Sequence, residues 1–152
     1  MSEIRIFIDA DACPVKDEAY KVAARYLLQV YVVSNGSRPI PPARRDHVKM
    51  ITVDEGADKA DDWIAERIGP KDVCVTSDIP LASRCLARGA RALAPTGKLW
   101  TPDNIGSALA GRELSRHLRE LGGGGGPPPF AKQDRSRFLS ALDSLVQQAL
   151  RA

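Results

Sequence analysis

The chain has 152 residues, of which 43% are hydrophobic and 27% are charged, and a formal net charge of +3. These values fit one globular domain large enough to bury its own core, and the mild charge permits a polyanionic partner without requiring one. No apolar run approaches the length of a membrane span and no signal-peptide pattern opens the chain, so we expect a cytoplasmic protein with no membrane partner.

Strand and helix patterns alternate along the first hundred residues. The residue types predict strands over 4–8, 29–34, 47–53, 72–77 and 91–94, and helices over 15–27, 57–68 and 79–88. Such alternation predicts a three-layer α/β/α sandwich, with a mostly parallel central sheet and right-handed crossovers. The first and fourth strands are almost continuously apolar, which is typical of strands buried on both faces.

The last third of the chain has a different pattern. Thr101-Pro102-Asp103 is a capped helix start, and the helix is predicted to run to about residue 121. A glycine run followed by three prolines at 122–129 predicts a linker, which divides the chain into an α/β domain over 1–121 and a C-terminal helix over 130–152. The broad apolar face of this last helix must be buried, either on the same domain or on a second copy in a homodimer.

Two aspartates end the first predicted strand. Because residues i and i+2 of an extended chain point the same way, Asp9 and Asp11 can aim at one point beyond the strand's carboxyl end. Open α/β sheets bind their ligands at this edge, and Asp78 follows the fourth strand at the same edge. The alternative is that Asp9 only ends the strand and that Asp11 caps the next helix.

A second acidic group lies at the start of the helix predicted over 57–68. Asp58, Asp61 and Asp62 are spaced i, i+3 and i+4 and share one flank, an arrangement that like-charge repulsion disfavours. A negatively charged first turn is the ordinary explanation, since the helix dipole favours it. Together with the strand-end acids, the group suits metal-assisted hydrolysis of a phosphodiester, in which cations activate water and stabilise the leaving oxygen. The candidate metal ligands are Asp9, Asp11, Asp58, Asp61, Asp62 and Asp78, and the candidate catalytic residues among them are Asp9, Asp11 and Asp78.

The identity of the metal follows from the available ligands. Three cysteines without a C-x-x-C pair and two isolated histidines argue against disulfides and against zinc. Oxygen ligands dominate, so the expected cofactor is Mg²⁺ or Mn²⁺. Cys13 lies near a helix start, but the acids beside it oppose ionisation of its thiol and argue against a catalytic role.

Several residues near these acids are candidates for substrate binding. Thr76 and Ser77 can position a water or a phosphate oxygen, and Lys16 can meet a phosphate; all three also fit ordinary strand-end or surface positions. Arginines in the proline-rich loop after the second strand can hold a nucleic-acid backbone, or can simply be solvated. These loop residues are Arg38, Arg44 and Arg45.

Three motifs, at residues 9–16, 58–63 and 76–82, closely resemble those of the uncharacterised bacterial YaiI/YqxD family. Residues 101–105 and 134–138 are similar to its C-terminal signature. The family is grouped with PIN-like domains, which are metal-dependent nucleases, often ribonucleases, with a parallel α/β/α sandwich. The resemblance implies that the six aspartates take the place of the PIN acidic cluster. The middle acid, often glutamate in PIN enzymes, is here one of three aspartates.

Three functions remain open from the sequence. The first is a nuclease that uses Mg²⁺ or Mn²⁺ to hydrolyse RNA or structured nucleic acid. The second is a phosphatase of the haloacid dehalogenase type with Asp9 as nucleophile and Asp11 as acid, although the acidic pair of this chain lies in a helix and not after a strand. The third is a non-catalytic module that binds nucleic acid or protein through its tail and through the helix predicted to end near residue 121, which is basic at Arg112, Arg116 and Arg119.

Overall fold

The computed structural model describes residues 4–10, 13–36, 45–54, 59–107 and 131–151. Its centre is a six-stranded sheet with the order β3-β2-β1-β4-β5-β6. Neighbouring strands are parallel except for the last pair, β5 and β6. The strands are β1 (Arg5–Asp9), β2 (Gln29–Ser34), β3 (Val48–Thr52), β4 (Val73–Val75), β5 (Arg91–Leu93) and β6 (Leu99–Trp100).

Strand β1 lies in the middle of the sheet because its side chains are apolar on both faces. Ile6, Phe7 and Ile8 are fully buried. Ile6 and Ile8 belong to one apolar cluster and Phe7 to another, since successive residues of a strand point to opposite faces. β4 pairs directly with β1, with Phe7 opposite Cys74. The prediction that the two continuously apolar strands are buried on both faces is confirmed, since the two valines of β4 also belong to one cluster and Cys74 to the other.

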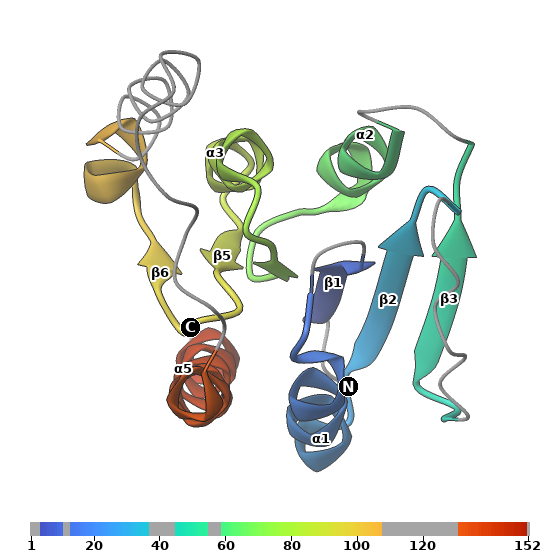
Figure 1. Cartoon of the computed structure of the whole chain (residues 1–152), viewed down its shortest axis with the longest axis vertical. Coiled ribbons are helices and arrows are strands. Elements are labelled where there is room, and N and C mark those ends of the chain that lie inside the picture. The colour runs from blue at the N-terminus through green and yellow to red at the C-terminus, as the bar shows by residue number, and fades with distance from the viewer. Residues whose placement is uncertain (1–3, 11–12, 37–44, 55–58, 108–130, 152) are drawn as a thin grey trace.

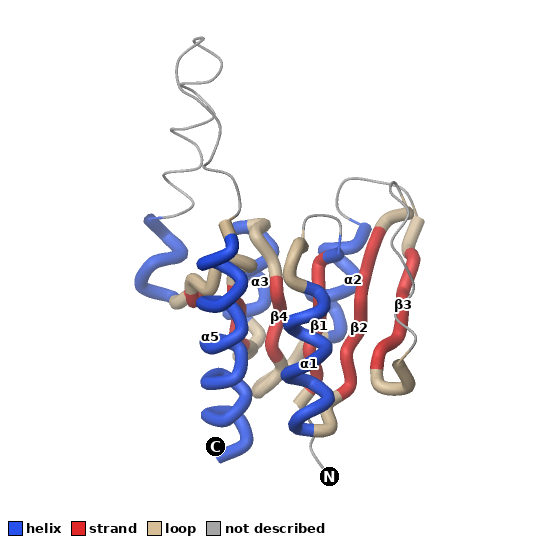
Figure 2. Tube along the Cα trace, turned by 60° about the horizontal axis from the view of Figure 1, so that its bottom comes forward, coloured by secondary structure: helices blue, strands red, loops and turns tan. Residues whose placement is uncertain are grey.

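Helices cover both faces of the sheet. Figure 1 shows α1 and α5 on one face and α2 and α3 on the other, and Figure 2 shows the same layers from another side. The predicted three-layer α/β/α architecture is therefore confirmed. The helices are α1 (Lys16–Tyr26), α2 (Lys59–Arg67), α3 (Ile79–Ala87) and α5 (Lys132–Arg151), and residues 102–107 are also helical.

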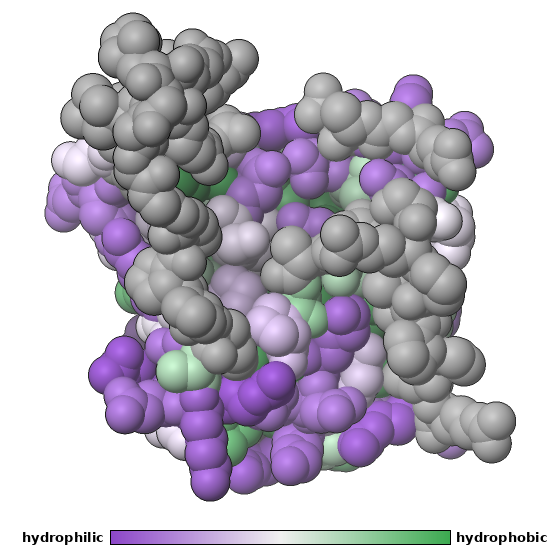
Figure 3. Space-filling view, viewed as in Figure 1, coloured by the Kyte–Doolittle hydropathy of each residue, from purple (hydrophilic) through white to green (hydrophobic). Residues whose placement is uncertain are grey.

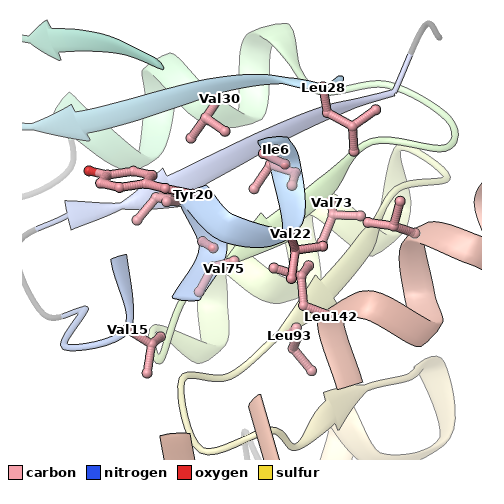
Figure 4. Packing of buried hydrophobic residues seen from close by; sticks show 14 of the residues in the cluster. Ile6, Val15, Tyr20, Val22, Leu28, Val30, Val73, Val75, Leu93 and Leu142 are labelled. Carbon is pink, nitrogen blue, oxygen red and sulfur yellow. The ribbon is translucent and has the colours of Figure 1, made fainter. Parts of the chain in front are cut away.

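Helix α5 completes the larger apolar cluster. Phe138 and Leu142 of α5 are fully buried among side chains of α1 and the sheet. Figure 4 shows Leu142 beside Leu93 of β5 and Val22 of α1. The apolar face for which the sequence left two partners open is therefore covered within the same chain. The expected linker over 122–129 lies outside the described residues.

Strand β6 is absent from the sequence prediction. It follows a tight turn in which Gly97 has a φ of 93°. A Cβ atom at Gly97 would lie 2.9 Å from the carbonyl carbon of Arg137, so the turn packs directly on the backbone of α5. The fourth strand is also shorter than predicted, because Asp72, Thr76 and Ser77 lie outside β4.

On the part of the face in Figure 3 formed by described residues, hydrophilic side chains predominate and apolar ones show only in small separate areas. Among the helices of the described ranges, none combines the length and the hydropathy needed to cross a bilayer.

Candidate functional site

The sheet has a topological switch point between β1 and β4. Helix α1 leads from β1 to β2 on one face, whereas α3 leads from β4 to β5 on the opposite face. The two connections leave the carboxyl ends of neighbouring strands in opposite directions, and α/β proteins commonly bind ligands at the crevice expected at such a point. Asp9 is the last residue of β1 and stands at this crevice.

Thr76 connects the two acids at the crevice. Its hydroxyl donates to Oδ2 of Asp9 at 2.9 Å and accepts from the backbone N–H of Asp78 at 2.9 Å. Thr76 itself is 1% exposed. Its single hydroxyl proton goes to Asp9, which fixes the orientation of that carboxylate. Through its hydroxyl, Thr76 thus joins the carboxylate of Asp9 to the backbone N–H of Asp78, an arrangement called here the Asp9–Thr76–Asp78 link.

Local structure explains why Asp78 stands where it does. Its Oδ1 accepts from the N–H of Leu81 at 2.9 Å, so Asp78 is the N-cap of α3, and Pro80 lies in the first turn. Capping occupies one carboxylate oxygen, and a carboxylate has two. Asp78 therefore caps α3 with one oxygen and has a second oxygen that can bind a cation.

The two described acids of α2 have different surroundings. Asp62 Oδ1 pairs with Nη1 of Arg84 at 2.8 Å, and both side chains are 46% exposed. A hydrogen bond with Cys85 and burial raise the pKa of the Cys74 thiol, and the charges of Asp9 and Asp61 raise this pKa further. Asp61 and Asp9 thus act on the same thiol. The hydrogen bond that Arg84 donates to Asp62 raises the pKa of Arg84, and the charges of Asp62 and Asp61 raise this pKa further.

A complete metal-binding group is not visible among the described residues. Within ranges 4–10, 13–36, 45–54, 59–107 and 131–151, no three His, Cys, Asp or Glu side chains gather closely enough to hold an ion. Two of the six candidate ligands, Asp11 and Asp58, lie outside these ranges, as do Arg38 and Arg44. Among the described residues, Asp9, Thr76 and Asp78 bring oxygen atoms to this crevice. Oxygen ligands suit a hard cation such as Mg²⁺ or Mn²⁺.

Cys13 is a poor candidate for a catalytic nucleophile. Burial raises the pKa of the Cys13 thiol to about 11, with smaller opposing effects of a Val15 backbone hydrogen bond and the Lys16 charge. The thiol is therefore protonated at neutral pH and is a poor nucleophile.

The other candidate substrate-binding residues are spread over the fold. Lys16 donates from Nζ to the carbonyl oxygen of Cys13 at 2.6 Å, so its charge lies close to the end of β1. Ser77 is exposed beside Thr76. Arg45 precedes β3, at the amino edge of the sheet, where its guanidinium lies 5.8 Å from the centre of the Tyr20 ring. The structure brings Lys16 and Ser77 to the crevice and places Arg45 elsewhere.

A cavity beside the crevice was not predicted from the sequence. Trp100 closes one side of it, and the indole N–H donates to the carbonyl oxygen of Thr76 at 3.3 Å. A hairpin pattern in the sequence could have predicted this wall of the cavity. Residues 95–98, which include Gly97, separate the β5 segment from Leu99 and Trp100.

Comparisons with known proteins agree with the motif resemblance. The model of the "Uncharacterized BCR, YaiI/YqxD family" matches residues 7–148. A UPF0178 protein of Paramagnetospirillum magneticum is 58% identical over 97% of each chain. A UPF0178 protein of Caulobacter vibrioides is 57% identical over 97% of this chain and 95% of its own, and one of Rhodospirillum rubrum is 53% identical over 97% and 99%. No solved structure was found to match the chain. The chain belongs to the YaiI/YqxD family.

Proposed function

We propose that this protein is a divalent-metal-dependent nuclease that hydrolyses phosphodiester bonds of RNA or structured nucleic acid at the crevice between β1 and β4. The observation that carries the proposal is the Asp9–Thr76–Asp78 link at the switch point of the sheet. The grouping of the YaiI/YqxD family with PIN-like nucleases, which the motif resemblance implies, is the independent support.

The link matters because it holds a carboxylate ready at the edge where ligands bind. Asp9 receives a hydrogen bond from a buried hydroxyl, and a fixed carboxylate loses less freedom when it binds a cation. Asp9 ends β1 and Asp78 follows the neighbouring strand β4, and a cation bound between two carboxylates relieves their mutual repulsion.

Each residue then has a defined task. Asp9 and Asp78 bind Mg²⁺ or Mn²⁺, together with Asp11 and an acid of the Asp58, Asp61 and Asp62 group. When bound, the cation neutralises phosphate charge and makes a water more acidic. Thr76 keeps Asp9 oriented, and the proposal assigns contacts with the phosphate to Ser77 and Lys16.

The test is metal-dependent cleavage of labelled single-stranded and hairpin RNA by the full chain. Asp9→Asn is expected to lower the cleavage rate about a hundredfold or more, since the cation supplies several kcal/mol of charge stabilisation. Asparagine keeps an oxygen acceptor for Thr76, so the fold should be preserved, which circular dichroism checks. The matched control is Asp17→Asn, an exposed acid in the first turn of α1, which should cleave at the unmodified rate.

Other outcomes point to the two alternative functions. Equal cleavage by the Asp9→Asn variant and the unmodified protein contradicts the proposed nuclease. Hydrolysis of a phosphomonoester with a trapped phosphoryl group on Asp9 would identify a phosphatase. Salt-sensitive RNA binding without hydrolysis of any substrate would identify a binding module.

A further inference from the structure

A cavity of about 370 Å³ opens beside the Asp9–Thr76–Asp78 link. Four parts of the chain form its walls: the start of α1, the segment after β4, the turn after β5, and β6. The lining residues are Pro14, Ser77, Ala94, Pro95, Thr96, Lys98 and Trp100.

The walls combine flat apolar surface with one cation. Trp100 is only 7% exposed, and Ala94 and Pro95 are buried. Nζ of Lys98 lies 4.9 Å from the centre of the Trp100 ring. Among the described residues that line the cavity, none carries a carboxylate that would repel an anion. A pocket of this kind suits a planar, weakly polar ring that carries a negative group.

The cavity is joined to the candidate catalytic edge through Thr76. The backbone carbonyl of Thr76 accepts from the Trp100 indole at 3.3 Å, while its hydroxyl donates to Asp9 at 2.9 Å. Ser77, the next residue, lines the cavity itself. A ligand in the cavity would therefore lie next to a phosphate held at Asp9.

We propose that this cavity is a nucleotide subsite, which takes the base of the nucleotide next to the scissile phosphate and sets the phosphate of that nucleotide against Lys98. The inference rests on the proposed nuclease function and names the unit of substrate that the protein recognises. Bases stack on aromatic rings whatever their sequence, so Trp100 and Pro95 predict tolerance of different bases.

Binding of mononucleotides without metal tests this subsite separately from cleavage. Isothermal titration calorimetry in a chelator would compare adenosine and uridine monophosphates with ribose 5-phosphate, which has no base. Both nucleotides should bind about tenfold or more tightly than ribose 5-phosphate, as expected for one stacked base.

Two variants locate the binding. Thr96→Trp places a large side chain at an exposed lining position and should abolish nucleotide binding. Lys98→Met keeps an apolar side chain of similar length but removes the charge. It should lower the affinity for adenosine monophosphate about fivefold and leave the affinity for adenosine unchanged. The matched control is Lys49→Met, on exposed β3 surface away from the cavity, which should bind as the unmodified protein does.

Any of three results would overturn the subsite. The protein could bind ribose 5-phosphate as tightly as the nucleotides, Thr96→Trp could bind nucleotide as the unmodified protein does, or the unmodified protein could bind no nucleotide at all. Asp9→Asn should still bind nucleotide in the chelator. Nucleotide binding without RNA cleavage would therefore contradict the nuclease and not the pocket, and RNA cleavage without nucleotide binding would contradict the pocket alone.

Discussion

Replacing Asp72 with alanine should lower the free energy of unfolding by about 3 kcal/mol, the lower end of the cost of breaking a buried ion pair. Asp72 is 2% exposed and lies just before β4. Its Oδ1 accepts from the backbone N–H of Arg5 at 3.0 Å, and its Oδ2 accepts from Nη2 of Arg5 at 2.7 Å and from the N–H of Gly69 at 2.9 Å. Alanine would leave these N–H groups without their acceptor. The half-exposed guanidinium of Arg5 can still bind water, so the expected loss of stability is at the lower end of the range for buried ion pairs.

The comparison variant is Glu66→Ala, which breaks the exposed pair of Glu66 and Arg67. Exposed pairs are worth about 1 kcal/mol or less, so this change should barely shift a urea unfolding curve. Similar losses for the two variants would show that the Asp72 network contributes no more than a surface charge pair.

Phe138→Ala should destabilise the protein by about 3–5 kcal/mol, the usual cost of removing a buried aromatic ring and leaving a cavity. Phe138 is completely buried and belongs to the apolar cluster that α5 shares with α1 and the sheet. The change also tests whether α5 is an integral part of the domain. A loss of this size in urea unfolding, with one cooperative transition, is the expected result.

Leu150→Ala is the matched control on the same helix. Leu150 is 44% exposed, so its truncation should change the free energy of unfolding by about 0.5 kcal/mol or less. If Phe138→Ala behaves like Leu150→Ala, or if the first transition melts α5 alone, then α5 is not part of the cooperative core.

The central layer of the fold was predictable because burial leaves a local pattern. Ile6, Phe7 and Ile8 form a continuous apolar run, which is found where a strand is covered on both faces. The apolar face of α5 was equally evident from the sequence pattern, but the surface that covers this face was not. An amphipathic face gains the same free energy on any apolar surface, and only the folded chain shows that α1 and the sheet cover it.

The candidate site was predictable only in part, since long-range pairing leaves no local signal. The positions of Asp9 and Asp78 at strand ends predicted that they share one edge of the sheet, where Thr76 joins the Asp9 carboxylate to the Asp78 backbone. Thr76 was predicted only as a residue that could position a water or a phosphate oxygen, because its bonds to Asp9 and Asp78 depend on the pairing of β1 with β4. Likewise, helical spacing groups Asp62 with Asp61, but Arg84, 22 residues further on, is what pairs with Asp62.

The most direct test of the proposed metal centre is a crystal of the full chain soaked in Mn²⁺ and measured at the manganese absorption edge. The expected result is an anomalous peak at the carboxyl ends of β1 and β4, in coordination contact with Asp9, which disappears in crystals of Asp9→Asn. The absence of a peak at that edge, or a peak there that survives the Asp9→Asn change, would contradict it.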